Sequence, residues 1–188
     1  MLKAMGLDEL DDAALMSRIA IGDRMAFRTL VGRLHGGAVR LATRVLSDQA
    51  EAEDAVQTAL VKLWTHAGRF EGEKGSLTGW FRRIVVNACL DRRRTIRVLA
   101  PLDQVAETPS GAPDPHEAAV GAEQAARVNA AVARLNPRQR AAIALFYGDG
   151  ATMAEIADTL DTTAKAVEGL LARARVELAQ MLSEGRRG

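Results

Sequence analysis

Residues 152–182 constrain the fold most, because their pattern predicts two helices joined by a tight turn. Thr152 is a favourable N-cap, and Glu155 three residues later completes a capping box. Asp161 falls at the turn, where a positive φ is often needed and where Asp is tolerated better than most residues other than Gly. Thr163 can cap the second helix. Apolar residues recur at steps of three and four on one face of each helix: Met153, Ile156, Ala157, Leu160, Val167, Leu170, Leu171, Ala174, Leu178 and Leu182.

The spacing within this stretch is typical of a helix-turn-helix, whose second helix enters the DNA major groove. Ala157 is small where two helices must cross closely, and Val167 lies ten residues later, where it can close the core. The alternative is an αα-hairpin that only packs against its neighbours. The positions of the small residue and of the turn favour DNA binding.

The composition favours helices and offers no catalytic centre. The 188 residues are 48% hydrophobic and only 4% aromatic, with few β-branched runs, which predicts an all-α globular protein. The single cysteine and three scattered histidines have no spacing that suits a zinc site or disulfide, so no cofactor is expected. No Ser/His/Asp order or phosphate loop supports an enzyme. The early acidic residues and the lack of a long apolar run predict a cytoplasmic protein.

The net charge of +1 conceals an uneven distribution. Residues 1–97 carry 16 Lys/Arg and 12 Asp/Glu, a balance of +4, whereas residues 98–126 carry no Lys/Arg and 5 Asp/Glu. Residues 127–188 return to +2, with 9 Lys/Arg and 7 Asp/Glu. Four of the five prolines fall within residues 98–120, which predicts a flexible acidic linker. This linker is either a solvated tether or an occupant of a basic channel.

Three helices are expected in the first third of the chain, at residues 8–21, 24–46 and 49–66, with a break or kink possible at Gly36 and Gly37. The third has an inward face of Ala55, Ala59, Leu60 and Leu63. Its other face shows Asp54, Gln57, Val61 and Trp64. A Trp beside polar groups is either an interface anchor or the edge of a core, and periodicity alone leaves both open.

The loop at residues 67–76 holds Phe70, which either plugs the local core or waits for a ligand, and the plug is favoured. Thr78 is expected to cap a helix at residues 79–97. Six arginines are expected to face water on this helix, an excess that predicts contact with a phosphate backbone: Arg82, Arg83, Arg92, Arg93, Arg94 and Arg97. Asn87 is either a satisfied core amide or a reader of a base edge.

Two further helices precede the helix-turn-helix, at residues 117–135 and 138–147, the latter capped by Asn136 and Pro137. The expected layout is therefore two small helical domains joined by a flexible linker. The N-terminal domain spans residues 1–97, the linker residues 98–120, and the C-terminal domain with its helix-turn-helix residues 121–188.

This layout resembles the bacterial sigma factors of the extracytoplasmic-function (ECF) group, over nearly the whole chain. Besides the Phe70 loop, the motifs that carry the resemblance are GDRMAF (22–27), AEDAVQTALVKLW (52–64), TGWFRRIVVNACLDRRR (78–94), LNPRQRAAIALFY (135–147) and EIADTLDTTAKAVEGLLARAR (155–175). The resemblance implies a promoter-recognition subunit of core RNA polymerase, commonly controlled by an anti-sigma factor.

The resemblance also implies residue roles. Binding to core polymerase falls to Asp54, Gln57, Leu60, Val61 and Trp64, which favours the interface interpretation of Trp64. Recognition of the −10 element, with a flipped base held by the loop, falls to Phe70, Asn87, Arg92, Arg93 and Arg94. Recognition of the −35 element falls to Lys165, Glu168, Gly169, Arg173 and Arg175.

Two of these positions depart from the family pattern. Glu168 and Gly169 stand where a basic and a small polar residue are common. Glu cannot hold phosphate but can accept a hydrogen bond from a cytosine amino group. The alternative function is an autonomous helix-turn-helix regulator that binds duplex DNA without polymerase. It accounts for residues 152–182 but not for the Arg-rich helix or Trp64.

Overall fold

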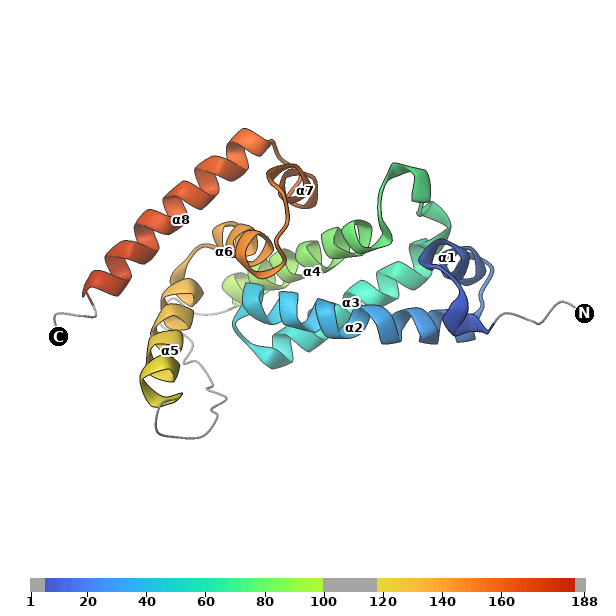
Figure 1. The fold of residues 1–188 in the computed structure, drawn as a ribbon, viewed down its shortest axis with the longest axis horizontal. Helices are drawn as coiled ribbons and strands as arrows, with labels where there is room; N and C mark the ends of the chain where they lie inside the picture. The colour runs from blue at the N-terminus through green and yellow to red at the C-terminus, as the bar shows by residue number, and fades with distance from the viewer. Residues whose placement is uncertain (1–5, 100–117, 185–188) are drawn as a thin grey trace, which may run out of the picture.

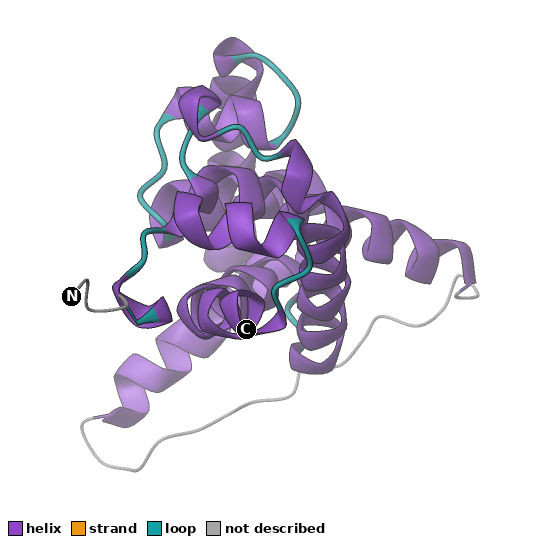
Figure 2. Cartoon of the chain, turned by 90° about the vertical axis from the view of Figure 1, so that its right-hand side faces the viewer, coloured by secondary structure: helices purple, strands orange, loops and turns teal. Residues whose placement is uncertain are grey.

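The structure is a computed structural model that describes residues 6–99 and 118–184, so most of the expected linker lies outside the described residues. Within those ranges the chain forms helices and no strand, which confirms the all-α prediction (Figures 1 and 2). The helices are α1 (Asp12–Ala20), α2 (Arg24–Leu46), α3 (Gln49–His66), α4 (Leu77–Leu99), α5 (Ala118–Arg134), α6 (Pro137–Ile143), α7 (Met153–Thr159) and α8 (Ala164–Glu184). Short 3₁₀ turns lie at Leu7–Glu9, Ala67–Arg69 and Gly72–Lys74, and a π-helical turn, Ala144–Gly148, extends α6.

Helices α1–α4 form the N-terminal domain, in which α2, α3 and α4 pack against one another and α1 packs on α2 (Figure 1). Apolar residues from all four helices are buried in one core, among them Leu15, Leu30, Leu63 and Val85. Aspartate N-caps begin α2 and α3, where the side chains of Asp23 and Asp48 accept hydrogen bonds from backbone N–H groups. The bounds of α3 are those predicted from the sequence.

Helix α2 continues through Gly36 and Gly37, where the sequence suggested a break. A glycine inside a helix costs about 1 kcal/mol relative to alanine. Leu30 and Leu41, on either side of the pair, are both buried against the rest of the domain. Packing on both sides therefore keeps the helix continuous through a locally unfavourable pair.

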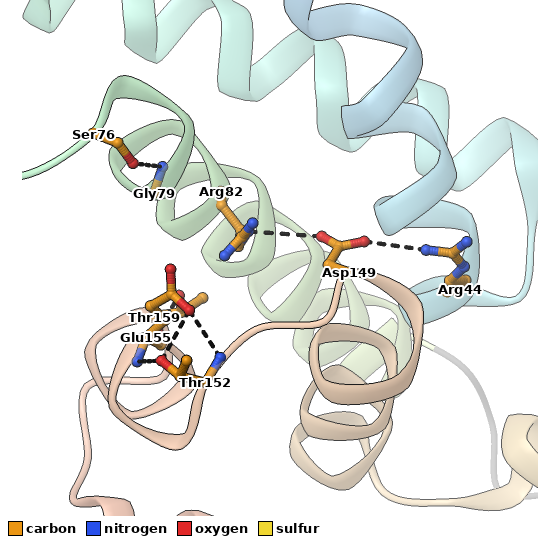
Figure 3. Close-up of polar contacts among 8 residues, drawn as sticks. All are labelled: Arg44, Ser76, Gly79, Arg82, Asp149, Thr152, Glu155 and Thr159. Carbon is orange, nitrogen blue, oxygen red and sulfur yellow. Dashed lines mark hydrogen bonds and ion pairs between the residues drawn. The ribbon is translucent and has the colours of Figure 1, made fainter.

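Two helix starts differ from the prediction. The expected helix at residues 8–21 is divided, since Leu7–Glu9 forms a separate 3₁₀ turn and Asp11 caps α1 by accepting from Ala14 N–H at 2.7 Å. Helix α4 begins two residues earlier than predicted, because the Ser76 hydroxyl, rather than Thr78, accepts from Gly79 N–H at 3.1 Å (Figure 3).

Helices α5–α8 form the C-terminal domain. The predicted capping box at α7 is present: Glu155 N–H donates to Thr152 Oγ1 at 3.3 Å and Thr152 N–H donates to Glu155 Oε2 at 2.8 Å (Figure 3). Asp161 adopts a φ of 51° in the turn, as predicted, and Val167 is fully buried between the two helices. The predicted helix-turn-helix is therefore α7, the turn and α8.

The two domains touch in the structure. Helices α6 and α7 and the π-helical turn of the C-terminal domain contact α2 and α4 of the N-terminal domain (Figure 1). The contact lies beside the Arg-rich part of α4, and it determines how accessible that surface is.

Candidate nucleic-acid and partner interfaces

The candidate partner face lies on α3. Asp54 and Gln57 are exposed, Val61 is 58% exposed, and Leu60 is half-buried. Trp64 is half-buried and packs edge-on against Phe27, with 5.1 Å between ring centroids. A shallow groove beside the Trp64 ring is lined also by Arg24, Phe27, Arg28 and Val31. Trp64 is therefore at once the edge of the core and part of an open groove.

Two exposed apolar residues near this face were not singled out from the sequence. Ile21, in the turn between α1 and α2, is 86% exposed, and Met25, in the first turn of α2, is 53% exposed. Met25 adjoins the groove residue Arg24 in the sequence, and apolar side chains that gather at the surface are typical of interaction surfaces. The available sequence signal was their position next to the Gly22-Asp23 stop, outside the apolar periodicity of α1.

The Phe70 loop is anchored on α4. The Phe70 ring is half-buried and lies 5.6 Å from the Trp80 ring, centroid to centroid. It packs against the N-terminal core, in keeping with the favoured plug interpretation. The same ring also lines a cavity of about 460 Å³, together with Trp80, Arg82, Arg83 and residues of α7. The ring thus has one side in the core and another at a cavity.

The predicted −10 residues on α4 differ in their surroundings. Asn87 is exposed, so the core-amide alternative is wrong. Arg92 is bound by two carboxylates of α3: its Nε donates to Glu51, and its Nη2 donates to Asp54 Oδ2 at 2.8 Å. These bonds raise the pKa of Arg92, the Glu51 hydrogen bond most. The structure therefore joins Asp54 and Arg92, which the sequence assigned to different partners.

The other arginines of α4 are also partnered or partly covered. Arg94 Nη2 lies 3.0 Å from Asp91 Oδ1 on the same helix, and both side chains are exposed. Arg93 is half-buried. Arg82 was expected to face water, but it lies against Asp149 of the C-terminal domain and is only 16% exposed (Figure 3). The side chain of Arg97 is outside the part that the structure describes.

The predicted −35 residues lie on α8. Lys165 and Glu168 are exposed and form an ion pair at 3.4 Å. Gly169 is half-buried beside the guanidinium of Arg173, which is exposed. Arg175 turns back instead: its Nε donates to the Tyr147 hydroxyl at 2.8 Å, and its guanidinium lies 5.8 Å from the Phe146 and Tyr147 ring centroids. Four of the five residues therefore share the open start of α8, and Arg175 is tied to the π-helical turn.

Arg140 is a buried charge that was not predicted from the sequence. It is 0% exposed, and its Nη1 donates to Ser47 Oγ at 3.3 Å and to the Ala133 carbonyl at 3.1 Å. Its Nε and Nη2 are buried without a hydrogen-bond partner. Burial, and to a lesser degree the nearby Arg93 charge, lowers the pKa of Arg140 to about 10. The available signal was its position four residues before Ala144, on the inner face of α6.

Neither a metal centre nor a membrane-spanning helix is found in the described ranges 6–99 and 118–184. In them, no group of three or more His, Cys, Asp or Glu residues could hold a metal ion. No helix there is long and apolar enough to cross a bilayer. The structure does contain two features typical of recognition: an Arg-rich helix beside an aromatic loop, and a helix-turn-helix with an exposed polar face. Together they define a two-domain helical nucleic-acid-binding protein.

Comparison with known proteins places this class in one family. Residues 30–97 match the model of sigma-70 region 2, and residues 125–178 match that of sigma-70 region 4. The ECF RNA polymerase sigma factor SigM of Mycobacterium tuberculosis is 35% identical over 179 residues, which cover 94% of this chain and 87% of SigM. The RNA polymerase sigma factor NccH of Alcaligenes xylosoxydans xylosoxydans is 33% identical over 91% of this chain and 94% of its own. The chain belongs to the ECF sigma factors of RNA polymerase.

Solved structures agree with this assignment. CnrH in complex with the cytosolic domain of CnrY matches with a TM-score of 0.65 and 27% identity, over 92% of this chain and 97% of CnrH. The sigma factor RpoE of Bartonella quintana, in complex with the anti-sigma factor NepR, matches in fold with a TM-score of 0.64 and 22% identity, over 84% of this chain and 96% of RpoE.

Proposed function

We propose that this ECF sigma factor binds core RNA polymerase and reads two promoter elements with its two domains. Residues 1–97 bind polymerase and the −10 element, residues 121–188 read the −35 element, and residues 98–120 link them. The observation that carries this division is the presence of separate recognition surfaces on α4 and α8, each within a region that matches a sigma-70 model. The protein contributes sequence readout and strand opening in the cytoplasm, without chemistry or a cofactor of its own.

The polymerase contact is the open face of α3. Asp54, Gln57, Leu60, Val61 and Trp64 form this face. The groove beside Trp64 offers an aromatic wall with Arg24 and Arg28 at its rim, which suits an apolar segment that carries acidic residues. Trp64 is the expected anchor, because a half-buried Trp in a groove loses little freedom on binding and covers a large area.

The −10 contact is the α4 surface with its loop. Phe70 and Trp80 line a cavity in which a flipped base can stack, and Arg82 and Arg83 stand at the same cavity to hold phosphates. Asn87 is exposed on α4 and can donate to and accept from a base edge. Arg92, Arg93 and Arg94 extend the basic surface toward the end of the helix, where Arg92 would exchange its carboxylate partners for phosphate.

The −35 contact is the N-terminal half of α8. Lys165 and Arg173 supply positive charge, Glu168 accepts from a cytosine amino group, and Gly169 permits close approach of the helix backbone. Arg175, held against Tyr147, is positioned for a phosphate at the groove edge.

The proposal includes an anti-sigma factor. CnrH and RpoE, which resemble this chain in fold, were solved with the cytosolic domain of CnrY and with the anti-sigma factor NepR, respectively. An inhibitor that covers the Trp64 groove and α4 together would block both polymerase and DNA. Specific transcription by the full-length protein in resting cells, with no inhibitor engaged, would make such a partner unnecessary.

The test is co-elution with core RNA polymerase followed by transcription from a promoter library. We expect Trp64→Ala to abolish co-elution and promoter-specific initiation. Ser17→Ala, at an exposed position on α1, is the control and should behave as the native chain does. Tight binding to duplex DNA with no binding to core polymerase would instead establish an autonomous helix-turn-helix regulator.

A further inference from the structure

A second basic cavity lies between α2 and α4, apart from the Phe70 loop. Its volume is about 360 Å³, and four of its lining residues are arginines: Arg33, Arg40 and Arg44 from α2, and Arg82 from α4. The floor is apolar, with Leu34, Leu41, Phe81 and Val85 among its residues. The Arg33 guanidinium is already paired with Asp12 at 2.9 Å and donates to the Asp8 carbonyl at 2.8 Å. The other three guanidinium groups, over an apolar floor, make a positive concavity that suits an anion.

The carboxylate of Asp149 fills part of this cavity from the other domain. Asp149 Oδ1 lies 3.1 Å from Arg44 Nη1, and Oδ2 lies 3.6 Å from Arg82 Nε (Figure 3). Asp149 and Arg82 side chains are only 23% and 16% exposed, so this pair is shielded from solvent more than an ordinary surface pair. One carboxylate thus bridges both helices that form the cavity.

The backbone conformation around Asp149 places its carboxylate between Arg44 and Arg82. The π-helical turn ends at Gly148, and Gly150 adopts a φ of 65°, so the chain reverses directly after α6. Asp149 N–H and Ala151 N–H both donate to the Leu145 carbonyl, at 3.3 Å and 3.0 Å. At Gly148 a Cβ would lie 2.6 Å from Arg44 Nη1, so only glycine lets the Arg44 side chain reach past the turn.

Further acidic groups of the C-terminal domain cover the neighbouring part of α4. Arg83 Nη2 lies 3.5 Å from Asp161 Oδ1 in the turn of the helix-turn-helix. Glu155 and Asp158 of α7 line the cavity that holds Phe70 and Trp80. The first part of the basic surface of α4, at Arg82 and Arg83, is therefore faced by carboxylates of α7 and of the turns on either side of it.

We propose that the Arg33–Arg40–Arg44–Arg82 cavity is a binding site for the phosphate backbone of an open DNA strand, and that Asp149 occupies it as an intramolecular substitute for phosphate. In the closed form the domain contact masks both this cavity and the Phe70 cavity beside it. Opening exposes a basic surface that runs from α2 across α4. The identity of the ligand as a −10 strand rests on the proposed function, whereas the domain contact itself does not.

A strand rather than a small anion fits the site, because Arg82 lines both cavities. A single phosphate would use one cavity. A strand could place a base against Phe70 and Trp80 and a phosphate between Arg82 and Arg44, so that both cavities serve one ligand.

The experiment measures domain opening and DNA binding on the same full-length protein. Dyes are attached to cysteines introduced by Glu53→Cys on α3 and Gln180→Cys on α8, in a chain with Cys89→Ala, and energy transfer between them reports closure. Binding is measured with a fluorescent single-stranded DNA 12-mer of random sequence. Asp149→Asn keeps the shape of the side chain and removes its charge. Glu184→Gln removes one charge from the far end of α8 and is the matched control.

We expect Asp149→Asn to lower energy transfer and to raise DNA affinity about fivefold, the effect of losing two partly shielded ion pairs. Adding Arg40→Gln to Asp149→Asn should reverse the gain in affinity and leave energy transfer low. Glu184→Gln should change neither.

Three results would overturn the proposal. Unchanged energy transfer in Asp149→Asn would show that this carboxylate does not hold the domains together. Opening without a gain in DNA affinity would show that the contact masks no DNA site. A gain for inorganic pyrophosphate, with none for the 12-mer, would assign the cavity to a small anion. If the native chain did not bind core polymerase, only the proposed function would be contradicted. The energy-transfer measurement needs no polymerase, so it would still test the domain contact.

Discussion

The two candidate DNA surfaces of this sigma factor differ in how available they are. On α8, Lys165, Glu168 and Arg173 face solvent, and Lys165 pairs with Glu168 of the same helix. On α4, Arg82 and Arg83 contact carboxylates of the C-terminal domain, and Arg92 contacts carboxylates of α3. A basic residue on the exposed face of a helix can therefore still be unavailable to DNA, because carboxylates far away in the chain can already be bound to it.

The largest effect is expected from a substitution that destabilises the C-terminal domain and leaves the N-terminal domain folded. Leu171→Ala empties a fully buried position in the core under α8 and should lower the free energy of unfolding of the C-terminal domain by about 3 kcal/mol. Binding to duplex promoter DNA selected with the native chain should be lost, whereas co-elution with core polymerase should persist. Circular dichroism melting and duplex binding are the measurements.

Val176→Ala is the matched control, since Val176 lies on the same helix but is 58% exposed. It should leave both the melting curve and duplex binding close to native. If Leu171→Ala also abolished polymerase binding, the two domains would have to be treated as one folding unit.

The second prediction concerns the buried charge at the domain contact. Arg140→Met removes a guanidinium that is fully buried with two unpartnered nitrogens, and keeps a side chain of similar reach. Replacing an incompletely paired buried charge by an apolar residue is often stabilising. We expect a gain of about 1 to 2 kcal/mol in the free energy of unfolding, measured by urea denaturation.

Arg134→Met removes the same charge from an exposed position at the end of α5 and should change stability by less than about 0.5 kcal/mol. Marked destabilisation by Arg140→Met would mean that its hydrogen bonds to Ser47 and Ala133 outweigh the cost of burial. Arg140 would then stabilise the contact between α6 and the end of α2 through its bond to Ser47.

The third prediction sharpens the account of the open surface. Glu168→Gln keeps the length of the side chain but adds a donor, so the preference for cytosine opposite this position should relax. When −35 sequences are selected from a random duplex library, the preference for cytosine over the other bases at one base pair should fall about tenfold. Glu177→Gln, on the same helix but bonded to Gln139 at 2.7 Å, should leave the selected sequence unchanged.

The smallest expected effect is in the pH dependence of the two domains. Hydrogen bonds from Ala26 N–H and from Thr152 lower the pKa of Asp23 and of Glu155 below their ordinary values of 3.8 and 4.5. A carboxyl with a lowered pKa stabilises the fold above its ordinary pKa, and this contribution is lost as the pH falls through the lowered value. Urea midpoints should therefore decrease below about pH 4.5.

Glu155→Gln should flatten this decrease for the C-terminal domain, and Asp23→Asn for the N-terminal domain. Fluorescence of Trp64 and Trp80 reports the N-terminal domain, and the single Tyr147 lies in the C-terminal domain. An identical pH profile in Glu155→Gln and in the native chain would show that the capping box does not contribute through its charge.

Local signals in the sequence were enough to predict most of the elements. The bounds of α3, the Asn136 cap, the capping box at Thr152 and the positive φ at Asp161 were all predicted, because each depends on residues within one turn. The continuity of α2 through Gly36 and Gly37 was not, since it depends on burial on both sides of the pair.

The exposure of the candidate site residues was predicted in part. The faces of α3 and α8 follow from periodicity, and exposure of Asn87 decided between two alternatives that the sequence left open. The bond between Arg92 and Asp54 joins residues 38 positions apart, and that between Arg44 and Asp149 joins residues 105 apart. No periodicity encodes such pairs, so the covered state of α4 could not be predicted from its own residues.

Gly148 has no side chain, so the size of a residue placed there could shift the equilibrium between the closed and the open arrangement of the two domains. Gly148 does not adopt a positive φ, and the three atoms nearest to an added Cβ, which are Nη1, Cζ and Cδ, all belong to the Arg44 side chain. Gly148→Ala would act as a wedge, displacing that guanidinium while leaving every charge in place. A series of substitutions of increasing size at this one position would raise, in steps, the fraction of molecules in which the two domains are apart and the surface of α4 is open to DNA.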